Sequence, residues 1–382
     1  MIKVGMIASL RGSWQGGVNY YHNLLGCYRK YPDPAVKLDV FSPFPEDVAG
    51  YQSDAIEIHP CPQLRHFRNY PRRIMKRLLR YDPVLTRVME RHHIDVLTHT
   101  TLGRQTRINT LQWIVDLQHK AIPEFFSPEE CARRDSEIGN ARLWGNVLLS
   151  SHSATKDFRG YYPELAQVRT HVLHFSSAEA LNVALLSRAE LEMQYPVHEP
   201  YFFLPNQFWQ HKNHAVVVEA LRRTSREIRV VCTGTMQDFR DVTYVPSLMD
   251  KVKQAGVEHR FVCLGVVPYP TMVSLMHHSV AVVQPSLFEG WSTTVEESKS
   301  MRKQIILSNI DVHLEQAPER GVYFSPDSPE ELAACLNRIY AEFSPEIEEG
   351  FVEQRSHYKT RLERDWIEDF ARIMKTVSGI EC

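Results

Sequence analysis

Two glutamates bracket a short turn that is rich in hydroxyl side chains. Glu289 and Glu297 stand in the pattern Glu-x7-Glu, and between them lie three candidates for the N-cap of a helix, Ser292, Thr293 and Thr294. The unpaired N–H groups and the positive dipole end of a helix start hold phosphate, whereas carboxylates accept hydrogen bonds from hydroxyl groups. This stretch therefore suits a nucleotide-diphosphate sugar, with N–H groups for its phosphates and carboxylates for the hydroxyls at either end.

A second loop carries a cation that this chemistry can use. Lys212 follows a predicted strand over residues 201–204 and precedes a predicted helix over 215–221. A flexible ammonium at that place neutralises a diphosphate leaving group. His211 and His214 lie in the same loop, but no third ligand is evident beside them, so we read them as loop residues lining the active-site cleft and predict no metal site.

Short β-branched runs alternate with helical patterns along the chain, which is typical of parallel sheets covered by helices. The predicted strands of the first half are 3–8, 37–41, 94–98, 111–115, 146–149 and 170–173. Those of the second half are 201–204, 228–232, 260–264, 280–283, 305–307 and 321–324.

These two sets predict an α/β protein with two Rossmann-like, doubly wound domains. The N-terminal domain is expected over residues 1–195 and the C-terminal domain over 196–360, because the polar stretch 194–200 carries two prolines and the strand pattern restarts after it. An amphipathic helix is expected within 361–382. Since ligands bind beyond the carboxyl ends of parallel strands, we expect the active site between the domains.

The stretch over residues 286–297 closely resembles the Glu-x7-Glu motif of the retaining nucleotide-sugar glycosyltransferases of family 4, which have the GT-B architecture. The resemblance covers nearly the whole chain and is strongest over 204–324. It implies that Glu289 contacts the hydroxyls of the donor sugar and that Glu297 contacts the hydroxyls of the ribose. It also implies that the last helix packs back on the N-terminal domain.

The resemblance assigns roles to further residues in other loops. Val266 and Val267 are implied to run under the nucleobase. His119 stands where the family has a histidine close to the donor sugar. Gly16 and Gly17 resemble the glycine loop that lies between the donor phosphates and the acceptor.

Two positions depart from the family pattern. In the family, an arginine and, five residues later, a lysine both contact the pyrophosphate; Lys212 matches the lysine, but Gln207 replaces the arginine. The change removes one cation and its bidentate geometry. Arg302 stands where the family usually has a glycine, so Arg302 has to adopt the backbone conformation that glycine supplies.

Composition limits the partners and the compartment. A net charge of −2 provides no strong attraction for nucleic acid, and no apolar run approaches the roughly 20 residues that span a bilayer. The seven cysteines include no Cys-x-x-Cys pair, which favours a reducing cytoplasm. Segment 65–80 is basic with apolar residues interspersed, which is typical of a helix lying peripherally on an anionic inner membrane face or holding a lipid-linked acceptor. A solvated basic face is the alternative.

Together these patterns predict an enzyme, a retaining hexosyltransferase. It would move a sugar from a nucleotide-diphosphate donor to a hydroxyl of a glycan or lipid-linked acceptor in the biosynthesis of cell-surface polysaccharide or lipid-linked glycan. No metal or other cofactor is expected, because the sequence lacks an Asp-x-Asp motif. The resemblance of loop 206–209 favours GDP-mannose over UDP-sugars. Two alternatives stay open, a catalytically weak sugar-nucleotide-binding partner protein and a GT-B sugar-nucleotide epimerase.

Overall fold

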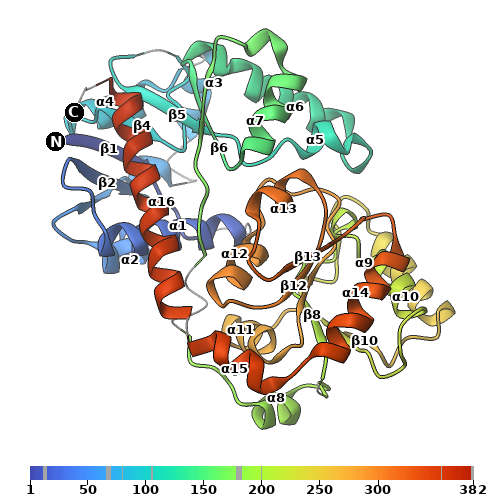
Figure 1. Ribbon diagram of the computed structural model, residues 1–382. Coiled ribbons are helices and arrows are strands. Elements are labelled where there is room, and N and C mark those ends of the chain that lie inside the picture. The colour runs from blue at the N-terminus through green and yellow to red at the C-terminus, as the bar shows by residue number, and fades with distance from the viewer. Residues whose placement is uncertain are drawn as a thin grey trace. The chain divides into compact units, whose positions relative to one another are not determined.

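The computed structural model describes residues 1–11, 15–65, 70–79, 81–104, 106–177, 183–198, 200–353 and 355–379. The chain forms two compact units, and each is built around one parallel sheet (Figure 1). The first unit consists of Met1–Leu117, Pro128–Phe175 and Arg361–Cys382, and the second of Gln118–Ser127 and Ser176–Thr360. The predicted α/β fold class with two doubly wound sheets is therefore confirmed.

The first unit alternates strands and helices along the chain. Its elements are β1 (Ile2–Ile7), α1 (Gln15–Lys30), β2 (Val36–Ser42), α2 (Pro45–Val48), β3 (Ile56–Pro60), α3 (Tyr70–Leu79), α4 (Pro83–Arg91), β4 (Val96–Thr98), β5 (Asn109–Trp113), α6 (Pro128–Gly139), β6 (Asn146–Leu149), α7 (His152–Tyr161), β7 (Arg169–Val172) and the end of α16 (Arg355–Ser378).

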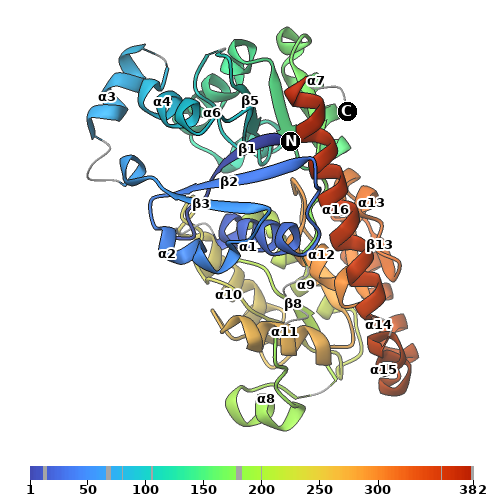
Figure 2. The same ribbon diagram turned by 90° about the vertical axis from the view of Figure 1, so that its left-hand side faces the viewer.

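The sheet of the first unit has the order β3-β2-β1-β4-β5-β6-β7, and β1, β2 and β3 run side by side (Figure 2). Alternate residues of a strand face opposite sides, and Val4 and Met6 of β1 point into a core that also contains Trp366 and Phe370 of α16. The last helix thus packs against the core of the first unit, as the resemblance implies.

The second unit repeats the alternation. Its elements are α5 (Gln118–Ala121), α8 (Arg188–Gln194), β8 (Phe202–Leu204), α9 (His214–Leu221), β9 (Val230–Cys232), α10 (Tyr244–Gln254), β10 (Phe261–Cys263), α11 (Tyr269–His278), β11 (Val282–Gln284), α12 (Thr293–Ser300), β12 (Ile305–Ser308), α13 (Asp311–Gln316), β13 (Gly321–Phe324), α14 (Pro329–Glu342) and α15 (Pro345–Glu353).

The sheet of the second unit has the order β10-β9-β8-β11-β12-β13, with every neighbouring pair parallel. Both of its faces are buried. Phe202 and Leu204 pack with α9, α10 and α14 on one face, whereas Phe203 packs with α11 on the other. This double burial explains why the strands read as continuous apolar runs.

The observed elements differ from the expectations in two places. Each predicted strand overlaps an observed one, but β3 was missed, so the first sheet has seven strands instead of six. The two compact units also divide differently from the expected domains, because Gln118–Ser127 and the residues after Ser176 group with the second unit.

Part of the basic segment 65–80 forms helix α3. The side chains of Ile74, Met75, Leu78 and Leu79 are exposed on it. Arg72 instead pairs with the buried carboxylate of Asp82 at 2.6 Å. Residues 66–69 and 80 of the segment lie outside the described residues. None of the described helices is both long and apolar enough to cross a membrane.

Candidate active site

The site of the second unit lies where the strand order of its sheet reverses. β8 pairs with β9 on one side and with β11 on the other, so the chain leaves β8 and β11 in opposite directions. Such a switch point opens a crevice at the carboxyl ends of the two strands. The loop with Lys212 follows β8, and the loop with Glu289 follows β11. The two loops are joined directly, because Leu287 N donates to the carbonyl oxygen of His211 at 2.8 Å.

An ion pair links the two predicted catalytic residues of these loops. Lys212 Nζ lies 2.5 Å from Glu289 Oε1, and the two side chains are only 14% and 11% exposed. Burial acts to raise the pKa of Glu289, but the charge of Lys212, its hydrogen bond and the nearby histidines together outweigh this effect, and the pKa is lowered overall. Glu289 is therefore a carboxylate at neutral pH and can accept hydrogen bonds from sugar hydroxyls.

A buried glutamine at the end of β11 organises both loops. Gln284 Nε2 donates to Glu289 Oε1 at 2.9 Å and to Ser292 Oγ at 3.0 Å. Its Oε1 accepts from Asn206 Nδ2 of the Lys212 loop at 2.7 Å. The sequence-based prediction did not include Gln284. The available signal was a polar residue directly after the apolar run Val280-Ala281-Val282-Val283, in a strand that is buried on both faces.

Helix α12 presents its N-terminus to this loop. Ser292 is the N-cap, since its side chain accepts from Val295 N, and Thr293 and Thr294 are the first helical residues. The N–H groups of these first positions have no acceptor within the helix. Gln316 fixes the cap, because its Oε1 accepts from Ser292 N at 3.2 Å and its Nε2 donates to Ser292 O at 3.0 Å.

Glu297 lies on α12 and is buried. It accepts a hydrogen bond from Tyr269 Oη at 3.0 Å, a residue that the sequence analysis did not single out. Burial raises the pKa of Glu297 to about 7, although the bond from Tyr269 opposes this shift. Tyr269 begins α11, directly after the loop with Val266 and Val267. Val266 is exposed, whereas Val267 is partly buried against the core.

The loop after β8 is held close to the loop after β9. Gln207 stands at the position of the family's arginine. Its side-chain oxygen Oε1 accepts a hydrogen bond from Thr235 N at 2.7 Å. Gly234 has φ +133°, and a Cβ there would lie 2.4 Å from the backbone oxygen of Asn206. Only glycine fits this approach without displacing backbone.

Replacing Gly234 by alanine is expected to destabilise the protein by about 2 kcal/mol, because the new methyl group clashes with backbone in a conformation that L-residues rarely adopt. Urea unfolding of the two proteins measures the difference. The matched control is Gly256→Ala. Gly256 also has positive φ, but no atom of the described residues lies within 4 Å of its Cβ position. Gly256→Ala should lower the free energy of unfolding by about 1 kcal/mol. Equal decreases for the two variants would contradict the proposed clash at Gly234.

Three further predicted site residues come from other elements of the chain. His119 is buried in α5, with its ring 6.4 Å from that of Phe126. Gly16 and Gly17 lie in the first turn of α1 in the first unit, and residues 12–14 of their loop lie outside the described residues.

The histidines of the Lys212 loop are packing residues. Burial lowers the pKa values of His211 and His214 to about 3, so both rings are neutral at physiological pH. His214 is fully buried and stacks on Phe208 at 4.3 Å between ring centroids. The expectation that His214 lines the cleft is therefore wrong, because this ring belongs to the core.

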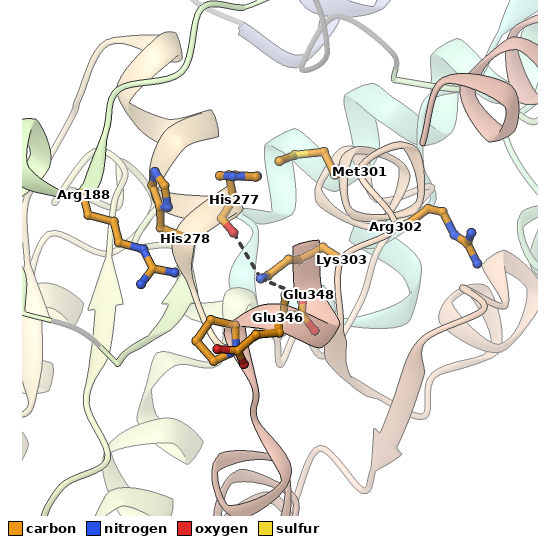
Figure 3. Close-up of a pocket in the computed structure, with 9 residues that line it drawn as sticks. Arg188, His277, His278, Met301, Arg302, Lys303, Glu346 and Glu348 are labelled. Atoms are coloured by element: carbon orange, nitrogen blue, oxygen red, sulfur yellow. Dashed lines mark hydrogen bonds and ion pairs between the residues drawn. The ribbon is translucent and has the colours of Figure 1, made fainter. Parts of the chain in front are cut away.

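A separate cavity of about 560 Å³ lies at the other end of α12 (Figure 3). Met301, Arg302 and Lys303 line it, and Lys303 Nζ lies 3.2 Å from both His277 O and Glu348 Oε2. Arg302 adopts φ +52°, as expected for a residue that replaces a glycine. Because this cavity adjoins the C-terminus of α12, it is not the phosphate end of the helix.

Comparison with known proteins agrees with this geometry. Residues 192–351 match the family model described as Glycosyl transferases group 1. The matched residues lie within the second unit. A curated relative, the uncharacterized glycosyltransferase MJ1607 of Methanocaldococcus jannaschii, is 24% identical over 125 residues, which are 32% of this chain. The chain spans only 30% of the length of that relative.

Solved structures share the fold over the whole chain. HepE of Anabaena, in complex with UDP and glucose, superimposes with a TM-score of 0.66 at 16% identity and covers 100% of both chains. Sucrose-phosphate synthase of Thermosynechococcus elongatus superimposes with a TM-score of 0.65 at 13% identity, and the match covers 98% of this chain and 99% of the synthase. WaaG, a glycosyltransferase involved in lipopolysaccharide biosynthesis, superimposes with a TM-score of 0.59 at 12% identity, and the match covers 99% of this chain and 100% of WaaG. These likenesses identify the two-domain α/β architecture as GT-B.

Proposed function

We propose that the chain is a retaining glycosyltransferase of family 4 that moves a sugar from a nucleotide-diphosphate donor to a hydroxyl acceptor. The observation that carries this proposal is the Lys212–Glu289 pair beside the N-terminus of α12, at the switch point of a group 1 domain. A cation, helical N–H groups and an ionised carboxylate are the groups that a diphosphate joined to a sugar requires.

The proposed roles follow from the chemistry of each group. Lys212 and the first N–H groups of α12 stabilise negative charge on the departing diphosphate. Glu289 accepts hydrogen bonds from the sugar hydroxyls, and Glu297 accepts them from the ribose. When the donor binds, its phosphate competes with Glu289 for Lys212, so the ion pair is expected to loosen. His119 is proposed to lie near the reacting carbon of the sugar.

Retention and independence of metal are parts of the proposal. Lys212 and the helix dipole supply positive charge from the protein itself, which is the support for a reaction without a metal ion. The leaving phosphate is proposed to take the acceptor proton on the same face, so no separate protein base is assigned. The product should therefore keep the anomeric configuration of the donor, and NMR of the product measures it.

The donor is proposed to be GDP-mannose, from the resemblance of loop 206–209, and UDP-glucose is the competing candidate because a solved relative of the same fold holds UDP and glucose. A thermal-shift screen of GDP-, UDP- and dTDP-sugars tests both. The true donor should raise Tm in a concentration-dependent way. If none of these sugars shifts Tm, the sugar-nucleotide proposal fails.

The second candidate function is a sugar-nucleotide-binding protein without useful transfer. Gln207 favours this second function, because its side chain supplies no cation and its Oε1 already accepts a hydrogen bond from Thr235 N. Release of nucleoside diphosphate that depends on an added acceptor separates the two, since only a transferase gives it. Turnover of a UDP-sugar without acceptor would instead indicate an epimerase.

A peripheral membrane contact is proposed for α3. Its exposed Leu78 and Leu79 lie in a segment rich in arginine, and such a helix binds anionic lipid through both apolar and charged groups. The protein should co-sediment with vesicles containing phosphatidylglycerol more than with neutral vesicles. The double variant Leu78→Ser/Leu79→Ser should co-sediment less with the anionic vesicles than the parent does, because it loses the apolar groups that insert, while equal sedimentation of both proteins would refute the contact.

A further inference from the structure

We propose that Asp39, His59 and His92 form a binding site for a divalent metal ion, preferably zinc, in the first unit. The three residues come from separate elements, β2, the edge strand β3 and the C-cap of α4 (Figure 2). One potential ligand atom of each lies within 4.8 Å of those of the other two. All three belong to the first unit, whereas the Lys212–Glu289 network belongs to the second.

The types of ligand favour zinc. Two imidazole nitrogens and one carboxylate oxygen are a set that binds Zn²⁺ with an open fourth position. Mg²⁺ and Ca²⁺ prefer oxygen ligands and would gain little from the two histidines. A water molecule would complete the tetrahedron at the open position.

The carboxylate of Asp39 supplies the second observation. Its side chain is fully buried, and Oδ1 lies 2.6 Å from His59 Nε2. The other oxygen, Oδ2, has no hydrogen-bond partner among the residues that the structure describes. A buried carboxylate oxygen without a partner is unfavourable. A metal ion shared with the two histidines would compensate this charge.

Packing holds the two imidazole rings beside each other. The rings of His59 and His92 are 4.2 Å apart between centroids. The buried ring of Phe41 stacks against His59 at 5.0 Å and contacts His92 edge-on at 5.0 Å. Because Phe41 restrains both rings, little side-chain entropy is lost when an ion binds.

Charged groups that adjoin the site act in opposite directions. Lys3 Nζ lies 3.6 Å from Asp39 Oδ1 and donates to His92 O at 2.7 Å, so its charge opposes a bound cation. Glu57 Oε1 lies 4.0 Å from His59 Nε2 and attracts a cation, and the ion pair of Glu57 with Lys37 offsets part of this attraction. Removing the charge of Lys3 should therefore strengthen metal binding, which a merely structural hydrogen-bond cluster does not predict.

The test uses the full chain after treatment with a chelator. Calorimetric titration with ZnCl₂ should reveal a stoichiometric site, and titration with Co²⁺ should give the visible absorption of a four-coordinate ion. His59→Gln and His92→Gln should each weaken zinc binding by at least about tenfold. The control is His22→Gln in the same unit, whose ring bonds Tyr51 Oη at 2.6 Å and lies outside the cluster. It should bind zinc as the parent does.

A substitution in the opposite direction completes the test. Lys3→Gln should tighten zinc binding on the order of tenfold, because a unit charge is removed from the neighbourhood of a doubly charged ion. The proposal is overturned if no stoichiometric zinc binding occurs, or if both histidine variants bind zinc like the parent. Both histidines keep part of their side chains exposed, whereas Asp39 is fully buried, so their variants test the site even if a variant of Asp39 fails to fold.

Discussion

Replacing Lys212 by methionine is expected to lower the rate of sugar transfer by about 10²–10³-fold. Methionine keeps the length and apolar stem of the side chain but removes the charge that stabilises the departing diphosphate. The effect should appear mainly in kcat, because the negative charge on the leaving group grows in the transition state. Steady-state assays with the donor identified by the thermal-shift screen measure it.

A matched control exists on helix α12. Lys299 pairs with Glu296 at 3.1 Å and is 13% exposed, so it resembles Lys212 in partner and burial. Lys299→Met should keep nearly full activity. Lys212→Met alone leaves the buried carboxylate of Glu289 without its cation, which should lower the free energy of unfolding. The double variant Lys212→Met/Glu289→Gln removes that carboxylate and should therefore recover the lost stability. It should still be inactive. Near-parental turnover of Lys212→Met would contradict the proposed role of Lys212 in stabilising the departing diphosphate.

Glu297→Gln is expected to remove a pH dependence from both stability and donor binding. The folded-state pKa of Glu297 is raised to about 7, above the 4.5 of an ordinary glutamate. The folded protein therefore holds this proton more tightly than the unfolded chain. Its stabilising contribution is fully present below pH 4.5 and is lost as the pH rises through 7, by roughly 3 kcal/mol at most. The glutamine variant should lack this loss.

Donor binding should change in the opposite sense. The carboxylate that accepts from the ribose hydroxyls forms only as the pH rises through about 7, so KM for the donor should fall between pH 6 and pH 8. Tyr269→Phe removes the hydrogen bond that favours the charged form and should move this transition to higher pH. Identical pH profiles for the parent and Glu297→Gln would contradict the assignment.

Much of the fold could be predicted because burial on both faces leaves a strong signal. Strands such as β8 and β9 consist of apolar residues throughout, and Ser292 caps α12 as expected. β3 was missed because it is an edge strand. Glu57 and His59 alternate with isoleucines there, as in a half-buried strand, but the run has only two isoleucines and ends at Pro60, so its apolar signal is weak.

The candidate site could be predicted only in part. Motif residues identify Lys212 and Glu289, but their contact at 2.5 Å depends on the pairing of β8 with β11. Gln316, which fixes the helix cap, carries no pattern of its own because amide side chains are common at surfaces. Gln284, which joins the two loops, is marked only by its place directly after an apolar run. Asp39, His59 and His92 are likewise too far apart in sequence for a motif, and only the register of β2 and β3 and the end of α4 bring them together.

The place of α16 affects how the protein is made. Val4 and Met6 near the start of the chain share one core with Trp366 and Phe370 near its end. During translation, which adds about 5–20 residues per second, the ribosome synthesises all of the second unit before these last partners emerge. The unit that is synthesised first is thus completed last, and the part of its core that α16 covers stays open to solvent during that interval.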